Sequence, residues 1–291
     1  MRLAIFSKTP LAAAPWELLK ALRKYTDIEV RLISEFNGYP DGRIFPIDLK
    51  LNCRDDGSRA VLAKADLWHV HNYMNRELPA MRKGRPVVAQ FHSLPRLGNW
   101  KELWDFTPLR YTIRQPLQEK EYGLPALPNL IDPDEYRPGK KGPIVRIAYA
   151  PSTRMPVGFP GSKGYAEVKK ILKGIAAKRI VDIVWIEGTP YERNLAMKST
   201  ADILIDDVVT GNFHRTSLEG ACFGCAVLNK NNAVPWVRTD LETLERTLLE
   251  LIDNPGTLRL HQELARSWVE SEWHAMDGVK EYEAAYRRAL Q

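Results

Sequence analysis

The chain has 291 residues, 44% of them hydrophobic, and a formal net charge of +6 at pH 7. This length suits two domains of roughly 130 to 150 residues, and the sequence has no run of about 18 apolar residues that could span a membrane. Three cysteines, an odd and small number, argue against a disulfide framework and suit a reducing cytoplasm. Met1 leads straight into a strand-like segment, so we expect no secretory signal and a cytoplasmic protein. The modest positive charge favours an anionic partner.

The first part of the chain alternates strand and helix patterns. Residues 2–7 and 28–34 predict strands, and a helix is expected from about Pro15 to Tyr25, with proline at a favourable early position. This opening is typical of a parallel, doubly wound sheet. Two apolar runs, 65–71 and 86–92, follow, and their polar ends should gather at the carboxyl edge of that sheet. The polar residues at these ends are His69, His71, Asn72, His92 and Ser93.

The histidines at this edge leave several interpretations open. His92 could face a substrate, or it could simply fix a loop by hydrogen bonds. A zinc site built from His69, His71 and His92 is conceivable, but no fourth ligand and no ligand spacing supports it.

The stretch between residues 76 and 114 combines basic and aromatic side chains. A basic face with exposed aromatic rings could hold a phosphorylated lipid, a sugar or a nucleic acid. The favoured alternative places the tryptophans in the core and leaves the arginines solvated. The residues are Arg76, Arg82, Lys83, Arg85, Arg96, Lys101, Arg110 and Arg114, with Trp100, Trp104, Phe106 and Tyr111 interleaved.

A proline-bounded segment, PNLIDPDEYRP at 128–138, separates the two halves. Asp132 and Asp134 have the spacing of a DxD metal motif, but the prolines around them indicate a turn instead. We therefore expect no metal site here. The predicted domains are residues 1–139 and 140–272, with a C-terminal helix at 273–291.

The second half restarts with a strand at 144–150 and a long loop at 151–164. A helix from Tyr165 to Ala177 and a strand at 181–186 follow, and Glu187-Gly188 ends that strand. The pattern of the first half is thus repeated, and a second doubly wound α/β domain is expected.

The stretch ADILIDDVVTGNFHRTSLEGACFGCAVLN, residues 201–229, carries the strongest functional signal. It reads as a strand, a turn at Gly211, a helix start, a glycine stop and another strand. The start of such a helix presents unpaired N–H groups and a positive dipole end, which suit phosphate. Glu219, one turn into the helix, can accept two hydroxyl hydrogen bonds, as a ribose requires. Cys222 and Cys225 have CxxC spacing, but their place in the helix-to-strand turn indicates packing.

Three motifs resemble the GT-B glycosyltransferases, especially retaining family 4. LEGACFGCAV, residues 218–227, resembles the second half of a Glu-x7-Glu pattern that runs into EAMACGxPV, with Glu219 at the second glutamate. Gly211 stands where the first glutamate is usual, and GNFH resembles a glycine-aromatic-glycine version with His214 in place of glycine. The segment 128–138 resembles the link that ends the first GT-B domain. Lys163-Gly164, preceded by Arg154, resembles the arginine and KG that open a helix in the family.

The resemblance implies a role for each of these residues. Lys163 and Arg154 would neutralise the leaving diphosphate, so that no metal and no cofactor beyond the nucleotide sugar is needed. His92 would lie by the sugar, as an orienting group more than a base. Donor contacts are implied for Gly211, Asn212, Phe213, His214 and Thr216 with phosphate and sugar, for Glu219 with ribose, and for Glu187 and Gly188 with the base.

The resulting hypothesis is a metal-independent, retaining glycosyltransferase that moves a sugar from a nucleoside diphosphate such as a UDP-sugar to a hydroxyl. The expected acceptor is a saccharide or a lipid-linked glycan at an anionic surface. An alternative acceptor is DNA with hydroxymethylated pyrimidines, as in viral base-modifying enzymes. A non-catalytic sugar-nucleotide or nucleic-acid binding module and a GT-B epimerase are further alternatives. The resemblance also implies that the last helix crosses back onto the first domain.

Overall fold

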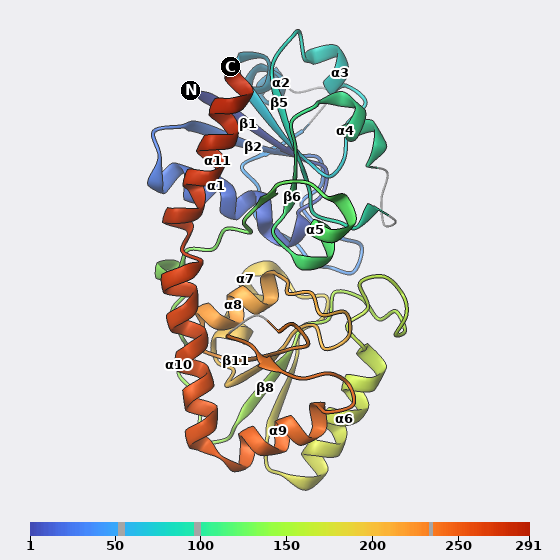
Figure 1. Cartoon of the computed structure of the whole chain (residues 1–291), viewed down its shortest axis with the longest axis vertical. Coiled ribbons are helices and arrows are strands. Elements are labelled where there is room, and N and C mark those ends of the chain that lie inside the picture. The colour runs from blue at the N-terminus through green and yellow to red at the C-terminus, as the bar shows by residue number, and fades with distance from the viewer. Residues whose placement is uncertain (52–55, 96–99, 233–234) are drawn as a thin grey trace. The chain divides into compact units, whose positions relative to one another are not determined.

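The computed structural model describes residues 1–51, 56–95, 100–232 and 235–291, and these divide into two compact units (Figure 1). Unit 1 comprises residues 1–132 and 274–291, and unit 2 comprises residues 133–273. Within the described ranges, no helix has the length and apolarity needed to cross a bilayer.

Unit 1 is built on a seven-stranded parallel sheet, as far as its described residues show. The strand order is β3-β2-β1-β4-β5-β6-β7, so the chain reverses its direction of travel between β1 and β4. Central β1 is buried on both faces, as expected for a parallel sheet covered on both sides. The strands are β1 (Arg2–Ser7), β2 (Glu29–Ser34), β3 (Leu49–Lys50), β4 (Leu67–His71), β5 (Val87–Phe91), β6 (Arg110–Ile113) and β7 (Ala126–Leu127).

Helices cover both faces of this sheet (Figure 1). On β1, Leu3 and Ile5 pack with α1 and α11, whereas Ala4 and Phe6 pack with residues of α2, α3 and α4. This alternation follows from the period of two along a strand. The elements are η1 (Leu11–Ala13), α1 (Ala14–Tyr25), α2 (Asp56–Lys64), α3 (Leu78–Met81), α4 (Lys101–Phe106), α5 (Pro116–Tyr122) and α11 (Ala275–Leu290).

The last helix, α11, belongs to unit 1 although it follows unit 2 in sequence. Val279, Tyr282 and Tyr286 are buried in the same core cluster as α1. The Tyr282 hydroxyl donates to the Pro128 carbonyl oxygen at 2.7 Å. Gly278 permits this approach, because a Cβ there would lie 2.3 Å from Leu130 Cδ2. The expected C-terminal helix that returns to the first domain is confirmed.

Unit 2 contains a five-stranded parallel sheet in the order β12-β11-β10-β8-β9 over the residues described. The chain reverses its direction of travel between β8 and β10, which makes this the topological switch point where ligands of such sheets bind. The elements are η3 (Pro133–Glu135), β8 (Arg146–Tyr149), α6 (Tyr165–Lys178), β9 (Asp182–Trp185), α7 (Tyr191–Ser199), β10 (Ile203–Ile205), α8 (Arg215–Cys222), β11 (Ala226–Asn229), β12 (Val237–Arg238), α9 (Leu244–Asp253) and α10 (Pro255–Glu272).

The unit 2 sheet is also covered on both faces (Figure 1). Ile203 and Ile205 of β10 face a cluster formed with α6 and α9, whereas Leu204 faces α8. A Cβ at Gly220 would lie 2.3 Å from Leu204 Cδ2, so glycine allows α8 to lie close against β10. The predicted pair of doubly wound α/β domains is therefore confirmed.

Candidate functional site

The carboxyl ends of β8 and β10 bring a lysine and an aspartate together in unit 2. Lys163 lies in the loop after β8 and Asp206 follows β10, and the Lys163 ammonium donates to Asp206 Oδ1. The two side chains are 3% and 0% exposed. The pair is therefore buried at the topological switch point, where sheets of this type bind ligands.

Asp206 also fixes the start of α8. Its Oδ2 accepts hydrogen bonds from Ser217 Oγ at 2.6 Å and from the His214 backbone N–H at 3.0 Å. The aspartate thus joins the β8 loop, the β10 end and the first turn of α8. The sequence shows Asp206 only as an interruption of an apolar run; its position directly after a short central strand is the signal that could have identified it.

The environment of Asp206 keeps its carboxylate charged. Burial alone would raise the pKa of Asp206, but the neighbouring Lys163 and His214 and the hydrogen bond from Lys163 outweigh this and hold the pKa well below its usual range. Asp206 thus offsets part of the Lys163 charge, and the α8 amides and other cations would add to the attraction for an anion at this point.

The loop before α8 is held in a defined turn. Asp207 Oδ1 accepts from the backbone N–H groups of Val209 at 2.9 Å and Thr210 at 2.7 Å. Gly211 then has a φ of +78°, and Asn231 Nδ2 donates to its carbonyl oxygen at 2.7 Å. Glycine adopts this left-handed conformation at the lowest cost, so Gly211 suits the turn before α8.

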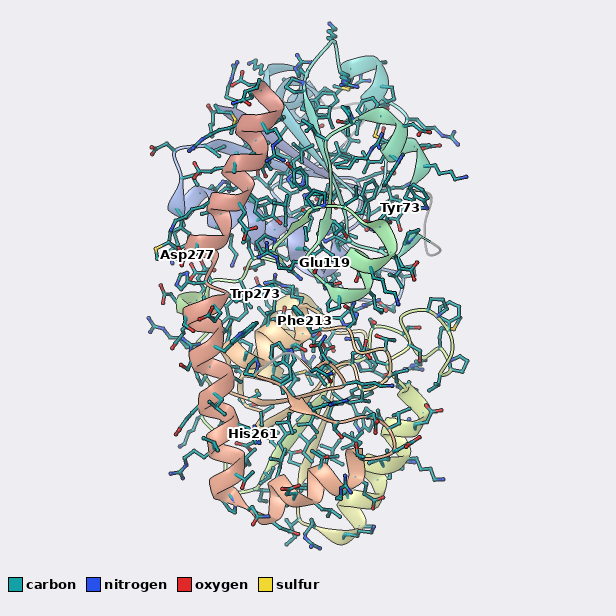
Figure 2. The ribbon with its side chains drawn as sticks, viewed as in Figure 1. Tyr73, Glu119, Phe213, His261, Trp273 and Asp277 are labelled. Atoms are coloured by element: carbon teal, nitrogen blue, oxygen red, sulfur yellow. The ribbon has the colours of Figure 1, made fainter. Side chains whose placement is uncertain are left out.

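The next residues differ in exposure. Asn212 is buried, and Phe213 packs against Trp236 and Trp273 with ring centroids 5.9 and 5.5 Å apart, so Phe213 is a core side chain in this structure (Figure 2). His214, the N-cap residue of α8, is half-buried. Thr216 is half-exposed on the first turn of α8.

The His214 imidazole lies over the two aspartates. Its Nδ1 is 3.7 Å from Asp206 Oδ2 and 3.9 Å from Asp207 Oδ2, and this buried nitrogen has no hydrogen-bond partner among the described residues. The switch point thus contains an imidazole nitrogen without a bound partner.

Glu219 lies deeper in α8 than its expected role requires. Its Oε2 accepts from Lys198 Nζ at 2.5 Å, and Arg215 Nε lies 3.1 Å from its Oε1. All three side chains are no more than 4% exposed. Arg215 also donates to Tyr136 Oη at 3.0 Å, which in turn lies 3.0 Å from Tyr191 Oη. In this structure Glu219 balances two buried cations and joins α7, α8 and the segment after residue 132.

Arg154 and Glu187 form a separate, exposed pair in unit 2. Arg154 Nη2 donates to Glu187 Oε2 at 3.1 Å, and the guanidinium carbon lies 5.5 Å from the centroid of the Tyr165 ring. The Arg154 side chain is 71% exposed. The neighbouring Gly188 is exposed with a φ of +56°. The two predicted donor residues Arg154 and Glu187 are therefore brought together at the ends of β8 and β9.

His92 lies in unit 1 and belongs to a group of imidazoles. His71 Nδ1 is 2.8 Å from His92 Nε2, and the His69 and His71 rings stack with centroids 4.2 Å apart. His69 Nδ1 is 2.9 Å from Tyr286 Oη on α11. Asn72, with a φ of +59°, accepts the His92 backbone N–H at 2.6 Å through Oδ1. His92 is thus held by its neighbours at the carboxyl end of β5.

Burial keeps these histidines neutral. It lowers the pKa of His69 and that of His92 to about 3, and it lowers the pKa of His71 well below the usual value. The neighbouring imidazoles add to the effect for His69 and His71. Tyr286 and His92 contact Nδ1 of His69 and of His71, whereas Nε2 of each has no hydrogen-bond partner among the described residues.

The loop between β1 and α1 carries unusual backbone. Leu11, Ala12 and Ala13 have φ values of 47°, 52° and 68°, a left-handed conformation that glycine normally provides. Burial raises the pKa of the nearby Tyr39 hydroxyl, and hydrogen bonds from the backbone of Leu11 and Ala12 partly lower it. Strained backbone of this kind is concentrated at functional sites.

The basic and aromatic stretch of unit 1 contributes mainly to the fold. Trp100 and Trp104 pack against the core cluster, and Arg110 lies 4.4 Å from the Trp104 ring centroid. Arg82 and Arg85 donate to backbone carbonyl oxygens, including Phe106 O at 2.7 Å and Ala65 O at 3.0 Å. Arg96 lies outside the described residues. The tryptophans are partly buried against the core, which is close to the favoured interpretation, but Arg82 and Arg85 bind backbone carbonyl groups where solvation was expected.

Two other sequence motifs have structural partners. Asp132 accepts from Lys24 Nζ at 2.6 Å and from Tyr25 Oη at 2.8 Å within unit 1. Cys222 and Cys225 are buried and not joined in a disulfide, and burial raises the pKa of Cys225 to about 12. A thiol of this kind is unreactive, which agrees with the packing interpretation.

Comparisons with known proteins identify the architecture. No protein-family model and no curated protein matches the chain. An alpha-glucosyltransferase in complex with UDP and a 13-mer DNA with a central A:G mismatch superposes with a TM-score of 0.70 at 12% identity, covering 98% of this chain and 100% of that one. HepE of Anabaena with UDP-glucose gives 0.64 at 10% identity, covering 99% and 100%. Sucrose-phosphate synthase of Thermosynechococcus elongatus gives 0.63 at 11% identity, covering 99% and 98%. The chain thus has the two-domain GT-B fold of these glycosyltransferases.

Proposed function

We propose that the protein is a glycosyltransferase that moves a sugar from a nucleoside-diphosphate sugar, such as a UDP-sugar, to an acceptor hydroxyl. The observation that carries the proposal is the buried Lys163–Asp206 pair at the switch point, which fixes the start of α8 through Ser217 and His214. The superposed proteins bind UDP or UDP-glucose in two of the three cases. Both the site and the fold therefore support a nucleotide-sugar donor.

The chemistry requires stabilisation of a leaving diphosphate. The bond between the anomeric carbon and the diphosphate oxygen breaks, a bond to the acceptor oxygen forms, and the acceptor proton passes to the departing diphosphate. Negative charge grows on that diphosphate, and the α8 amides, with Lys163 and the more exposed Arg154, would stabilise it. We further propose that transfer needs no metal ion, because the fixed positive groups provide this stabilisation.

The remaining donor contacts follow the same scheme. Thr216 and the turn at Gly211 would approach the phosphates and the sugar, and Glu187 with Gly188 would approach the base. Because Glu219 already balances Lys198 and Arg215, its contact with ribose would use the unoccupied lone pairs of its carboxylate. Retention at the anomeric carbon and membership of family 4 rest on the sequence motifs.

The proposed acceptor is a saccharide or a lipid-linked glycan. A second candidate is a hydroxymethylated pyrimidine in DNA, and a specific observation favours it: an alpha-glucosyltransferase bound to DNA containing an HMU base superposes over 98% of this chain and 99% of its own, with a TM-score of 0.68. The net charge of +6 is compatible with a nucleic-acid acceptor. We propose that the protein is cytoplasmic with either acceptor, as the low cysteine content of the chain favours.

A labelled-donor assay tests the proposal. The full chain is incubated with radiolabelled UDP-glucose and with each acceptor: an HMU-containing duplex, the unmodified duplex, and a panel of saccharides. We expect transfer to one acceptor class, unaffected by a metal chelator. Lys163→Ala should slow turnover by roughly a hundredfold or more, because one preorganised charge-stabilising group is lost.

The matched control is Lys170→Ala, which removes an exposed lysine from α6. It should leave turnover unchanged, and thermal unfolding of both variants shows whether each is folded. Normal turnover in the Lys163 variant would contradict the proposed role of Lys163. Donor binding without transfer or hydrolysis, for any nucleotide sugar, would favour a non-catalytic binding module.

A further inference from the structure

A polar pocket lies in unit 2, at the β12 edge of the sheet. It has a volume of about 680 Å³ and is formed by the end of β11, the end of β12 and the first turns of α9. This volume is within the range of small-molecule sites. Gly211, at the turn assigned to the donor site, is one of its lining residues, whereas Lys163, Arg154 and Glu187 are not, so the pocket adjoins the proposed donor site at that turn and extends away from it.

The charge of this pocket is positive and only partly neutralised. Lys230, Arg238 and Arg246 line it, and their side chains are exposed. Its carboxylate, Asp240, is engaged at the start of α9, where Oδ1 accepts from the Thr243 N–H at 3.0 Å and from Thr243 Oγ1 at 2.8 Å. Neither Arg238 nor Arg246 forms an ion pair with any carboxylate in the described part of the chain. Arginine presents forked N–H groups that match the oxygens of a phosphate.

The rest of the lining is suited to hydroxyl groups. Thr239 Oγ1 lies 3.1 Å from both Thr243 Oγ1 and Thr247 Oγ1, and these threonines, two asparagines and Asp240 offer donors and acceptors. No aromatic residue is among the described side chains that line the pocket, so a nucleobase would find no ring to stack on. These properties favour a phosphorylated sugar over a nucleotide.

We propose that this pocket binds a sugar phosphate, with the phosphate on Arg238, Arg246 and Lys230 and the sugar hydroxyls on Asp240 and the threonines. The pocket is also connected to the loop before α8. Asn231 donates to the Gly211 carbonyl oxygen at 2.7 Å, and Lys230 Nζ donates to the Val209 carbonyl oxygen at 3.1 Å. A ligand that contacts Lys230 and Asn231 therefore acts on the loop that leads into the proposed donor site. The binding itself does not depend on the proposed function.

Isothermal titration calorimetry of the full chain tests the proposal, with glucose 6-phosphate, inorganic phosphate and glucose as probes at low ionic strength. Glucose 6-phosphate should bind best, phosphate more weakly, and glucose not measurably. The double variant Arg238→Gln/Arg246→Gln should weaken glucose 6-phosphate binding by about tenfold or more, because two charge-assisted contacts are lost. The matched control, Arg259→Gln, removes an exposed arginine from α10 and should bind as the unaltered protein does.

Saturation with UDP separates this pocket from the donor site. If binding of glucose 6-phosphate persists under UDP and is lost in the double variant, the proposal is supported, whether or not the protein transfers sugar. Displacement by UDP, together with unchanged affinity in the double variant, would place the probe on the donor site and overturn the proposal. Absence of binding to the unaltered protein at millimolar concentration would also overturn it. A third result would overturn it as well: a short DNA duplex binds the unaltered protein but not the double variant, and glucose 6-phosphate binds neither. The pocket would then hold a nucleic-acid backbone.

Discussion

The two units bury polar side chains at the same place in their sheets, the carboxyl ends of the central strands, but they use different chemistry. Unit 2 buries charged groups: the Lys163–Asp206 pair at those strand ends, and Glu219 with two cations beneath α8. Unit 1 buries neutral imidazoles, with His71 joined to His92 and His69 to a tyrosine. Charged groups with fixed partners are suited to holding an anionic donor. Neutral imidazoles can donate or accept a hydrogen bond without binding a charge.

The units also differ in how they shape their loops. In unit 2, glycines take the left-handed positions at Gly161, Gly164 and Gly211. In unit 1 the loop after β1 places Leu11, Ala12 and Ala13 in the same conformation without glycine. Unit 2 thus builds its site on relaxed backbone and unit 1 on strained backbone. Strain in a loop at the β1–β4 reversal points to a functional constraint there.

The largest effect should follow from breaking a charged pair in unit 2. Lys163→Met leaves the Asp206 carboxylate buried without its cation, and we expect a loss of roughly 3–5 kcal/mol in the free energy of unfolding of unit 2. The double variant with Asp206→Asn should recover part of the lost stability, because the uncompensated carboxylate charge is removed. Hydrogen exchange measured by mass spectrometry, read separately on peptides of β8 and β4, checks the result. Equal loss of protection in both units, or no recovery in the double variant, would contradict the comparison.

A smaller effect, confined to unit 1, should follow from acidification. The pKa of His69 is 6.5 in its ordinary state and about 3 when buried, so the unfolded chain binds a proton that the folded chain does not. The contribution of neutral His69 to the free energy of unfolding is fully present above the unfolded pKa, and it decreases as the pH drops from 6.5 towards 3. Between about pH 7.5 and 5.5 we expect a loss of about 1.4 kcal/mol per buried histidine. The paired Asp206 has a lowered pKa, so its contribution is lost only below its unfolded value of 3.8.

Urea unfolding at the two pH values, with unit-resolved hydrogen exchange, measures this dependence. His69→Gln should remove its own share of the pH dependence, while the dependence due to His71 persists. Equal hydrogen-exchange protection in β4 and β5 at both pH values would contradict the prediction. The buried neutral imidazoles would then not account for a difference in pH dependence between unit 1 and unit 2.

The helices and strands of both units could be predicted from the sequence more fully than the hydrogen-bond and ion-pair partners of the site residues. The strand at 2–7 and the helix that starts at Tyr165 occur as expected, because apolar periodicity and helix-start signals act over a few residues. Glycine before α8 marked the turn at Gly211 for the same reason. Local patterns of this kind sufficed to predict two doubly wound sheets.

The partners of the site residues depend on contacts distant in sequence. Asp206 reaches Lys163 only because β10 pairs with β8, which joins residues 43 positions apart. His69 meets Tyr286 across 217 positions, through the return of α11 to unit 1. No local period encodes such pairings. Glu219 was assigned to ribose from its motif, and neither Lys198 nor Arg215 was foreseen as its partner, because the motif does not include the packing beneath α8.

The smallest effect concerns the loop backbone and has opposite signs in the two units. Ala12→Gly, at an exposed left-handed residue of unit 1, should raise the free energy of unfolding by about 0.5–1 kcal/mol, because relief of the αL strain exceeds the entropy cost of glycine. Gly211→Ala in unit 2 should lower it by roughly 1 kcal/mol through conformational strain alone, since no atom lies within 4 Å of the added Cβ. Urea unfolding of both variants measures these changes. If the strain in unit 1 serves a ligand, Ala12→Gly should also weaken donor or acceptor binding while it stabilises the fold; stabilisation without any change in binding would show that the left-handed turn serves the fold alone.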